Sequence, residues 1–231
     1  RDRSPSRGLG DVYKRQIFIL FIKGILAGIA IGIGGWLYLK TREISGNIVL
    51  AAFLFSIGLI LICNFGFFLY TGKICYLFQK ENQYQTPRYV FQLLIGLIGN
   101  YLGALLVGTI FKVVNDVPEF VYQMIETKVS YEWWKIFILG IFCGMLIYFA
   151  VEGFARIENQ FGKYIVLVFC VAGFIICGFE HCIANMFYLS LDNQITIESI
   201  VSIIMVILGN SVGGLLVPTI CLFLNQKEGK Q

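Results

Sequence analysis

Long apolar runs alternate with short polar segments along this chain of 231 residues. Each run exceeds the ~10 residues of a strand in a membrane β-barrel, and each approaches or exceeds the ~20 residues that a transmembrane helix requires. The pattern therefore predicts six transmembrane helices and an all-α membrane protein. The predicted spans cover about residues 17–39, 47–78, 89–111, 134–151, 163–191 and 197–224.

Polar residues and glycines interrupt the second and fifth runs. The second is predicted to break around residues 71–73, and the fifth around residues 178–181. A broken helix leaves backbone N–H and C=O groups that lipid cannot satisfy, so both breaks must line a cavity or be buried in protein. The residues expected to form or hold the breaks are Thr71, Gly72, Gly178, Glu180, His181 and Asn185.

Two parts of the chain resemble each other. GNYLGALLVGTI, which begins at Gly99, matches GNSVGGLLVPTI, which begins at Gly209, at eight of twelve positions. FIKGILAG, at the start of the first span, likewise resembles FILGIFCG at the start of the fourth. These matches predict a first repeat, about residues 17–112, and a second, about residues 131–224. Because three spans are an odd number, the second repeat must enter the membrane from the opposite side, as in many transporters and channels.

The repeat offset of 110 residues pairs Thr71 with His181, the only histidine. Ionisable side chains inside a span are costly and usually functional. Half-helix N-termini carry partial positive charge, which attracts anions. Two breaks that meet at mid-depth therefore predict a passage for a small anion, centred on Thr71 and His181. The alternatives are a histidine that is hydrogen-bonded between helices and a threonine that bonds to the backbone of its own helix.

Glu180 is unusual in the middle of a span, because an ionised and unpaired carboxylate is expensive there. We expect it to be protonated or bonded to backbone N–H groups of the break. Asn185, four residues after His181, is expected to bond a freed carbonyl. Both side chains could scaffold the break or touch the substrate.

Composition supports a lipid-facing surface. Only 14% of the residues are charged, against roughly 25% in soluble domains. Seven cysteines lie in apolar stretches without a Cys-x-x-Cys pair, so we expect no metal site, disulfide framework or cofactor. Common catalytic and nucleotide-binding motifs are missing from the sequence, and we expect no enzyme activity.

The net charge of +4 indicates orientation in a membrane rather than nucleic-acid binding. Loops on the side of the termini carry more lysine and arginine than the opposite loops, which predicts a cell-membrane protein with both termini in the cytoplasm.

Residues 1–16 are polar, basic and without periodicity. We interpret them as a disordered or foreign leader that precedes a channel domain of residues 17–231.

GFEHCIANMFY, residues 178–188, resembles the signature of the formate/nitrite transporter family. LYTG, residues 69–72, is similar to that family's Leu-Phe-Thr-Ser loop, and the two Gly-Asn segments match its motifs in helices three and six. The resemblance runs from about residue 17 to the end. It implies an aquaporin-like fold, a homopentamer with one pore in each protomer, and passage of small monovalent anions such as formate, nitrite or hydrosulfide.

The resemblance also implies two apolar constrictions that flank the histidine, and it places Lys128 in the outer vestibule. The outer constriction would comprise Phe55, Leu59 and Phe174, and the inner one Leu69, Tyr70 and Ile147. Gly144 and Tyr70 depart from residues common in the family, so the choice of substrate stays open. Without the resemblance, plain helix packing would explain these apolar side chains.

A proton donated by His181 would let the substrate cross as a neutral acid, which desolvates more readily than an anion. Two other functions are compatible with the sequence. A pore for water or glycerol would give flux that is insensitive to pH and to substitution of His181. A membrane-embedded enzyme would use His181 and Glu180 and would turn over a substrate without transporting it.

Overall fold

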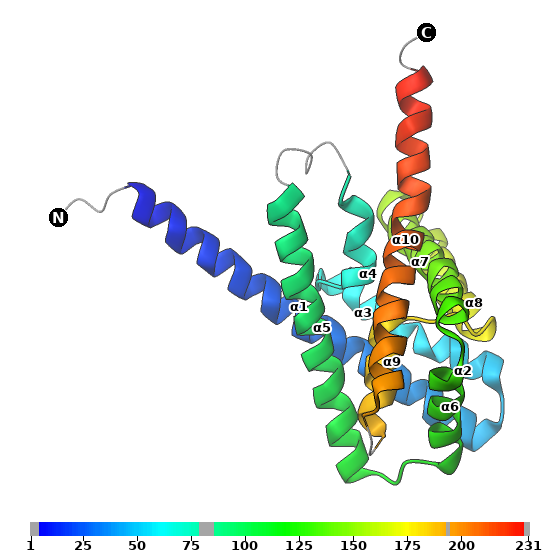
Figure 1. Ribbon diagram of the computed structural model, residues 1–231. Helices are drawn as coiled ribbons and strands as arrows, with labels where there is room; N and C mark the ends of the chain where they lie inside the picture. The colour runs from blue at the N-terminus through cyan, green and yellow to red at the C-terminus, as the bar shows by residue number, and fades with distance from the viewer. Residues whose placement is uncertain (1–4, 79–85, 193–194, 229–231) are drawn as a thin grey trace.

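The computed structural model describes residues 5–78, 86–192 and 195–228. Every regular element in these ranges is helical, which confirms the all-α prediction (Figure 1). In chain order the elements are α1 (Pro5–Ser45), α2 (Ile48–Phe55), α3 (Ile57–Phe65), α4 (Tyr70–Lys73), the 3₁₀ turn η1 (Ile74–Tyr76), α5 (Thr86–Val114), α6 (Glu119–Ser130), α7 (Trp133–Arg156), α8 (Gln160–Ile176), α9 (Cys182–Leu191) and α10 (Ile197–Glu228).

Within the described residues, five helical segments are long and apolar enough to cross a membrane. They correspond to the first, second, third, fourth and sixth predicted spans. The segments are Val12–Ser45, Ile48–Phe65, Thr86–Val114, Trp133–Arg156 and Ile197–Asn225. The predicted fifth span consists of two shorter apolar helices, α8 and α9, with residues 177–181 between them.

The polar segment of residues 1–16 is largely helical, because α1 begins at Pro5 and runs without interruption into the first span. This end of α1 projects away from the other helices (Figure 1). Residues 1–4 lie outside the described residues, and the foreign origin of the segment stays a prediction.

Glycines bring α1 against α5, and α7 against α10. A Cβ atom at Gly24 of α1 would lie 3.2 Å from the Cα atom of Gly99 in α5. In the second pair, a Cβ atom at Gly140 of α7 would lie 3.1 Å from the Cα atom of Gly209 in α10. Helices approach this closely only where side chains are small, which is how helices commonly pack in membranes. The similar segments of the two halves therefore make similar contacts.

Gly28→Ala is expected to destabilise the protein. The new Cβ atom would overlap the backbone oxygen of Asn100 and lie 2.8 Å from the backbone nitrogen of Ala104. Backbone atoms cannot move aside as a flexible side chain can, so we expect a loss of about 1–3 kcal/mol, measured as a lower unfolding temperature in detergent. Gly173→Ala in α8 is the matched control, because nothing lies within 4 Å of its Cβ position. An unfolding temperature equal to the parent's for Gly28→Ala would contradict the close contact.

The outer faces of the long helices expose large apolar side chains. Leu94 of α5, Phe169 of α8 and Leu208 of α10 are examples. Soluble monomers rarely expose extensive apolar surface. This surface suits lipid or neighbouring protein.

Candidate functional site

Two interruptions of the helices share one local geometry. α3 ends at Phe65 and is followed by Gly66, whose φ is 64°, and α4 begins at Tyr70. Gly178, whose φ is 68°, separates α8 from α9, which begins at Cys182. A left-handed φ favours glycine because a Cβ atom would be strained there. In both places a glycine turns the chain out of one helix, and a new helix starts four residues later.

A buried asparagine of α5 holds the first interruption. The amide nitrogen of Asn100 donates to the backbone oxygens of Gly24 and Phe68, at 2.8 and 2.7 Å. Its side-chain oxygen accepts the backbone N–H of Tyr70 at 2.8 Å. Asn100 thus satisfies backbone groups that the interruption frees.

Asn210 of α10 does the same for the second interruption. It donates to the backbone oxygens of Gly140 and Glu180, at 2.9 and 2.8 Å, and accepts the backbone N–H of Cys182 at 2.9 Å. Asn185 was expected to bond a freed carbonyl, but its side-chain nitrogen donates to Glu180 instead, and neither Gly-Asn asparagine was expected to hold a break. Their recurrence at matching places in the two halves was the signal that could have found them.

The matched hydrogen bonds change how the two halves correspond. They align Tyr70 with Cys182, which is an offset of 112 residues instead of 110. Leu69 therefore corresponds to His181, and each is the N-cap residue of its short helix with extended backbone angles. Thr71 is not the counterpart of His181, although the two lie in contact.

Gly72 does not form the first break, contrary to expectation. It lies inside α4, and the break falls earlier, at Gly66. The offset of 110 residues relates the two Gly-Asn motifs, but it does not relate the two breaks. The stretch from the break to the Gly-Asn motif is two residues shorter in the second half than in the first. Gly178 lies between α8 and α9.

His181 and Thr71 are both buried, and Nε2 of His181 lies 2.9 Å from Oγ1 of Thr71. The Nδ1 atom of His181 accepts the backbone N–H of Ala184 at 3.2 Å and so caps α9. A neutral imidazole carries one N–H, so the hydrogen sits on Nε2 and is donated to Thr71. The hydroxyl of Thr71 keeps its own hydrogen for another acceptor.

Two of the three residues predicted for the outer constriction line the larger cavity with His181, and one of them, Phe174, contacts its ring. The rings of Phe55 and Phe174 pack edge to face with their centroids 6.0 Å apart. The Phe174 ring stacks on the imidazole of His181, and these two centroids are 5.8 Å apart. Leu59, the third, is buried in α3, four residues after Phe55. The histidine therefore has an apolar surface on one side.

The three residues predicted for the inner constriction are all buried. Leu69 caps α4 and lies two residues before Thr71. The hydroxyl of Tyr70 lies 2.8 Å from that of Ser211 in α10. Ile147 belongs to α7.

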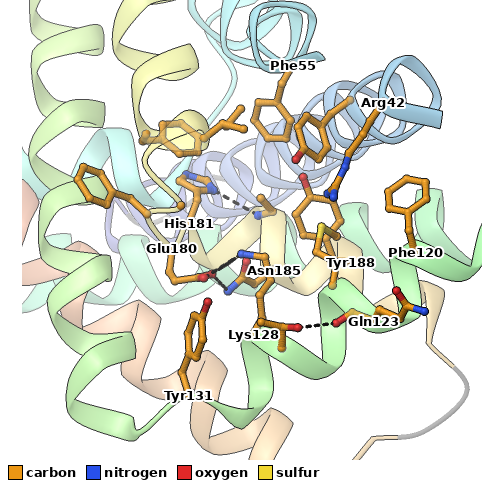
Figure 2. A pocket seen from close by; sticks show the side chains of 18 residues that line it. Arg42, Phe55, Phe120, Gln123, Lys128, Tyr131, Glu180, His181, Asn185 and Tyr188 are labelled. Atoms are coloured by element: carbon orange, nitrogen blue, oxygen red, sulfur yellow. Dashed lines mark hydrogen bonds and ion pairs between the residues drawn. The ribbon is translucent and has the colours of Figure 1, made fainter. Parts of the chain in front are cut away.

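Two cavities adjoin these residues. The larger, about 420 Å³, is lined by His181, Phe174 and side chains of α6 (Figure 2). The smaller, about 170 Å³, is lined by Leu69, Gly72 and Phe154. Because α6 precedes the start of α7 and Phe154 lies near its end, the two cavities lie toward opposite ends of α7.

Glu180 is paired with a lysine, which differs from the expected protonated or backbone-bonded carboxyl. Its two oxygens accept hydrogen bonds from Nζ of Lys128, at 2.9 and 2.7 Å, and Asn185 donates a further bond at 2.7 Å (Figure 2). Lys128 belongs to α6, so the pair ties this short helix to the second interruption. Lys128 lines the larger cavity, where Glu180 balances its charge; its place in an outer vestibule stays a prediction.

The centre of the site offers hydrogen-bond donors in apolar surroundings. The imidazole of His181 stacks on the Phe174 ring, and its Nε2–H meets the Thr71 hydroxyl. Such donors suit an anion that has lost part of its water shell. Within the described ranges, no three His, Cys, Asp or Glu side chains cluster as a metal site would require.

Comparison with known proteins gives one consistent family. The sequence model described as formate/nitrite transporter matches residues 10–224. A formate-nitrite transporter of Plasmodium knowlesi is 28% identical over 253 residues, covering 96% of this chain and 80% of the relative. Formate channel FocA of Haemophilus influenzae is 23% identical over 187 residues, covering 75% of this chain and 66% of that protein.

Solved structures agree with these sequence matches. A pentameric formate channel with formate bound has a TM-score of 0.82 and 25% identity, covering 92% of this chain and 98% of that one. A structure described as an FNT family ion channel also has a TM-score of 0.82, at 20% identity, covering 93% of this chain and 92% of that one. The second likeness concerns the fold alone.

Proposed function

Because the chain belongs to the formate/nitrite transporter family, we propose that it conducts small monovalent anions across a cell membrane. The observation that carries this proposal is the hydrogen-bonded pair of Thr71 and His181, with a cavity toward each end of α7 and aromatic rings beside the histidine. The formate channels among its relatives support an anion as the substrate.

The proposed architecture is six spans in an inverted 3+3 repeat, aquaporin-like, with broken second and fifth helices. α2 to α4 form the second span, and α8 with α9 forms the fifth. Three matched features support it: the glycine contacts of α1 with α5 and of α7 with α10, the two left-handed glycines, and the two asparagines. The repeats would cover about residues 17–112 and 131–224.

The proposed assembly is a homopentamer with a separate pore in each chain. The similar pentameric formate channel supports the number of subunits. Thr71 and His181 belong to the two halves of one chain, which supports a pathway within the protomer. The positive charges on the side of the termini favour a cytoplasmic location for both ends.

We infer that the anion exchanges water for the hydrogen bonds of His181 and Thr71. Leaving water is costly for a charged group, and fixed N–H and O–H donors offset part of the cost. The apolar residues proposed for the constrictions, Phe55 with Leu59 and Phe174, and Leu69 with Tyr70 and Ile147, exclude hydrated solutes by dewetting.

The proposal that His181 itself donates a proton has a geometric difficulty. An imidazolium carries hydrogens on both nitrogens, and Nδ1 already accepts the N–H of Ala184. Protonating the ring would therefore break the cap of α9. We favour a neutral His181 that donates a hydrogen bond from Nε2, while any proton on the substrate comes from water in the larger cavity.

Flux measurements on the purified chain test this function. Reconstituted into proteoliposomes, it should carry formate and nitrite, and formate influx should rise as the external pH falls if the acid crosses in neutral form. Glycerol should not pass. The detergent-solubilised complex should have the mass of five chains.

Two results would overturn the proposal. Glycerol or water flux without anion flux would indicate a neutral-solute pore. Chemical turnover of a candidate substrate without any flux would indicate an enzyme. A stable monomer would contradict the pentamer alone.

A further inference from the structure

The larger cavity holds a second cation besides Lys128. Arg42, near the C-terminal end of α1, lines the same cavity. The described residues form three ion pairs, and Arg42 is in none of them; Lys128 is already bonded to Glu180. Of the two cations, Arg42 is therefore the one whose charge no carboxylate of the described residues balances, and it can attract an anion that enters the cavity.

The guanidinium of Arg42 is held against an aromatic ring. Its central carbon lies 4.8 Å from the centroid of the Phe120 ring, which belongs to α6. Arg42 extends from α1 into the side of the cavity where Phe120 and Tyr188 also lie (Figure 2). Stacking on a ring orients the plane of a guanidinium but leaves its N–H edges open for hydrogen bonds.

Two tyrosine hydroxyls accompany Arg42. Tyr38 lies one turn before Arg42 on the same face of α1, and Tyr188 lies on α9; both line the cavity. Neither hydroxyl has a hydrogen-bond partner among the described residues. In this part of the chain, every side-chain oxygen or nitrogen that is fully enclosed does have a partner, so these two hydroxyls are not fully enclosed. Both hydroxyls are therefore open to the cavity.

We propose that Arg42, with the hydroxyls of Tyr38 and Tyr188, forms a carboxylate-binding site in the larger cavity, where substrates gather before they reach His181. This inference rests on the proposed anion transport. A planar guanidinium binds the two oxygens of a carboxylate through parallel N–H···O bonds, and a tyrosine hydroxyl can donate to the same oxygens. An anion such as hydrosulfide has no second acceptor atom and interacts with Arg42 only as a point charge.

A purely structural role for Arg42 is the rival explanation. The stacking of Arg42 on Phe120 joins α1 to α6, and its loss could loosen this contact. A structural role would lower stability and change the transport of all anions alike. A binding role separates carboxylates from other anions, so the test compares two substrates.

The experiment uses Arg42→Lys, which keeps the charge and loses the planar fork, and Arg42→Gln, which loses both. Lys40→Gln is the matched control, because it removes a cation of the same helix that does not line the cavity. KM and maximal flux are measured in proteoliposomes for formate and for hydrosulfide. Unfolding temperatures in detergent are recorded for each variant.

We expect Arg42→Lys to raise the KM for formate about three- to tenfold, because the site is partly open to water, and to leave the KM for hydrosulfide near the parent's. Arg42→Gln should raise both values, and formate's more. Equal effects on both anions, or no effect with formate, would overturn the proposal. A parent chain that carries no anion would instead defeat the proposed function, so the two failures are distinguishable.

Discussion

His181→Asn is expected to reduce formate flux by about ten- to a hundredfold while the protein stays folded. Asparagine is a favourable N-cap residue, so its side-chain oxygen can still accept the N–H of Ala184, as Nδ1 of His181 does. Its shorter side chain cannot place a donor where Nε2–H lies. A hydrogen bond to a charged group contributes about 1.5–3 kcal/mol, and each 1.36 kcal/mol is about tenfold in rate.

Two companion variants separate transport from folding. Thr71→Val keeps the shape of the side chain and removes the hydroxyl that meets Nε2, so it should also lower flux. His181→Phe removes the cap as well as the donor, so it should lower the unfolding temperature in addition to flux. Parent-like flux with an unchanged pH profile in His181→Asn would exclude His181 from the conduction pathway.

Glu180→Gln is expected to cause a large loss of stability. The substitution leaves the ammonium of Lys128 without its carboxylate and weakens the bond from Asn185. Removing one partner of a buried pair costs about 3–5 kcal/mol. The side chain of Lys128 is 22% exposed, so water reduces this cost, and we expect about 2–3 kcal/mol, seen as a lower unfolding temperature in detergent.

A double-mutant cycle isolates the pair. Lys128→Met removes the cation, so Glu180→Gln in that background should cost much less than in the parent. Glu43→Gln is the control for an exposed pair, because Glu43 bonds Lys40 on the surface of α1 and should contribute under about 1 kcal/mol. Additive effects of the two cavity substitutions would show that Lys128 and Glu180 are not coupled.

The positions of the long helices could be predicted because the apolar runs exceed the length that a bilayer requires. The all-α fold and the family both followed from the sequence, the first from these runs and the second from residues 178–188. Gly178, which stands beside charged residues in an apolar run, has a left-handed φ between α8 and α9; that it forms the break of a spanning helix stays a prediction. Local composition alone was sufficient for these features.

Features that depend on contacts between distant residues could not be predicted. The first break was placed at Gly72 because one offset was applied to the whole repeat, whereas the two halves differ by two residues after the break. The partner of Glu180 was missed because Lys128 lies 52 residues earlier in the chain, on α6. Arg42 was missed because its contact with Phe120 joins two elements far apart in the chain, and an arginine just beyond the predicted first span gives no sign of this in the sequence.

The two asparagines that hold the interrupted helices have a mechanical consequence. Asn100 and Asn210 each use both amide hydrogens and the side-chain oxygen on backbone atoms of a neighbouring long helix and of the interrupted segment. Displacing either interruption would break two hydrogen bonds at once, those to Phe68 and Tyr70 or those to Glu180 and Cys182. The middle of the molecule is therefore expected to act as a rigid sieve that separates solutes of equal charge by width. Any opening or closing motion has to arise nearer the membrane surfaces.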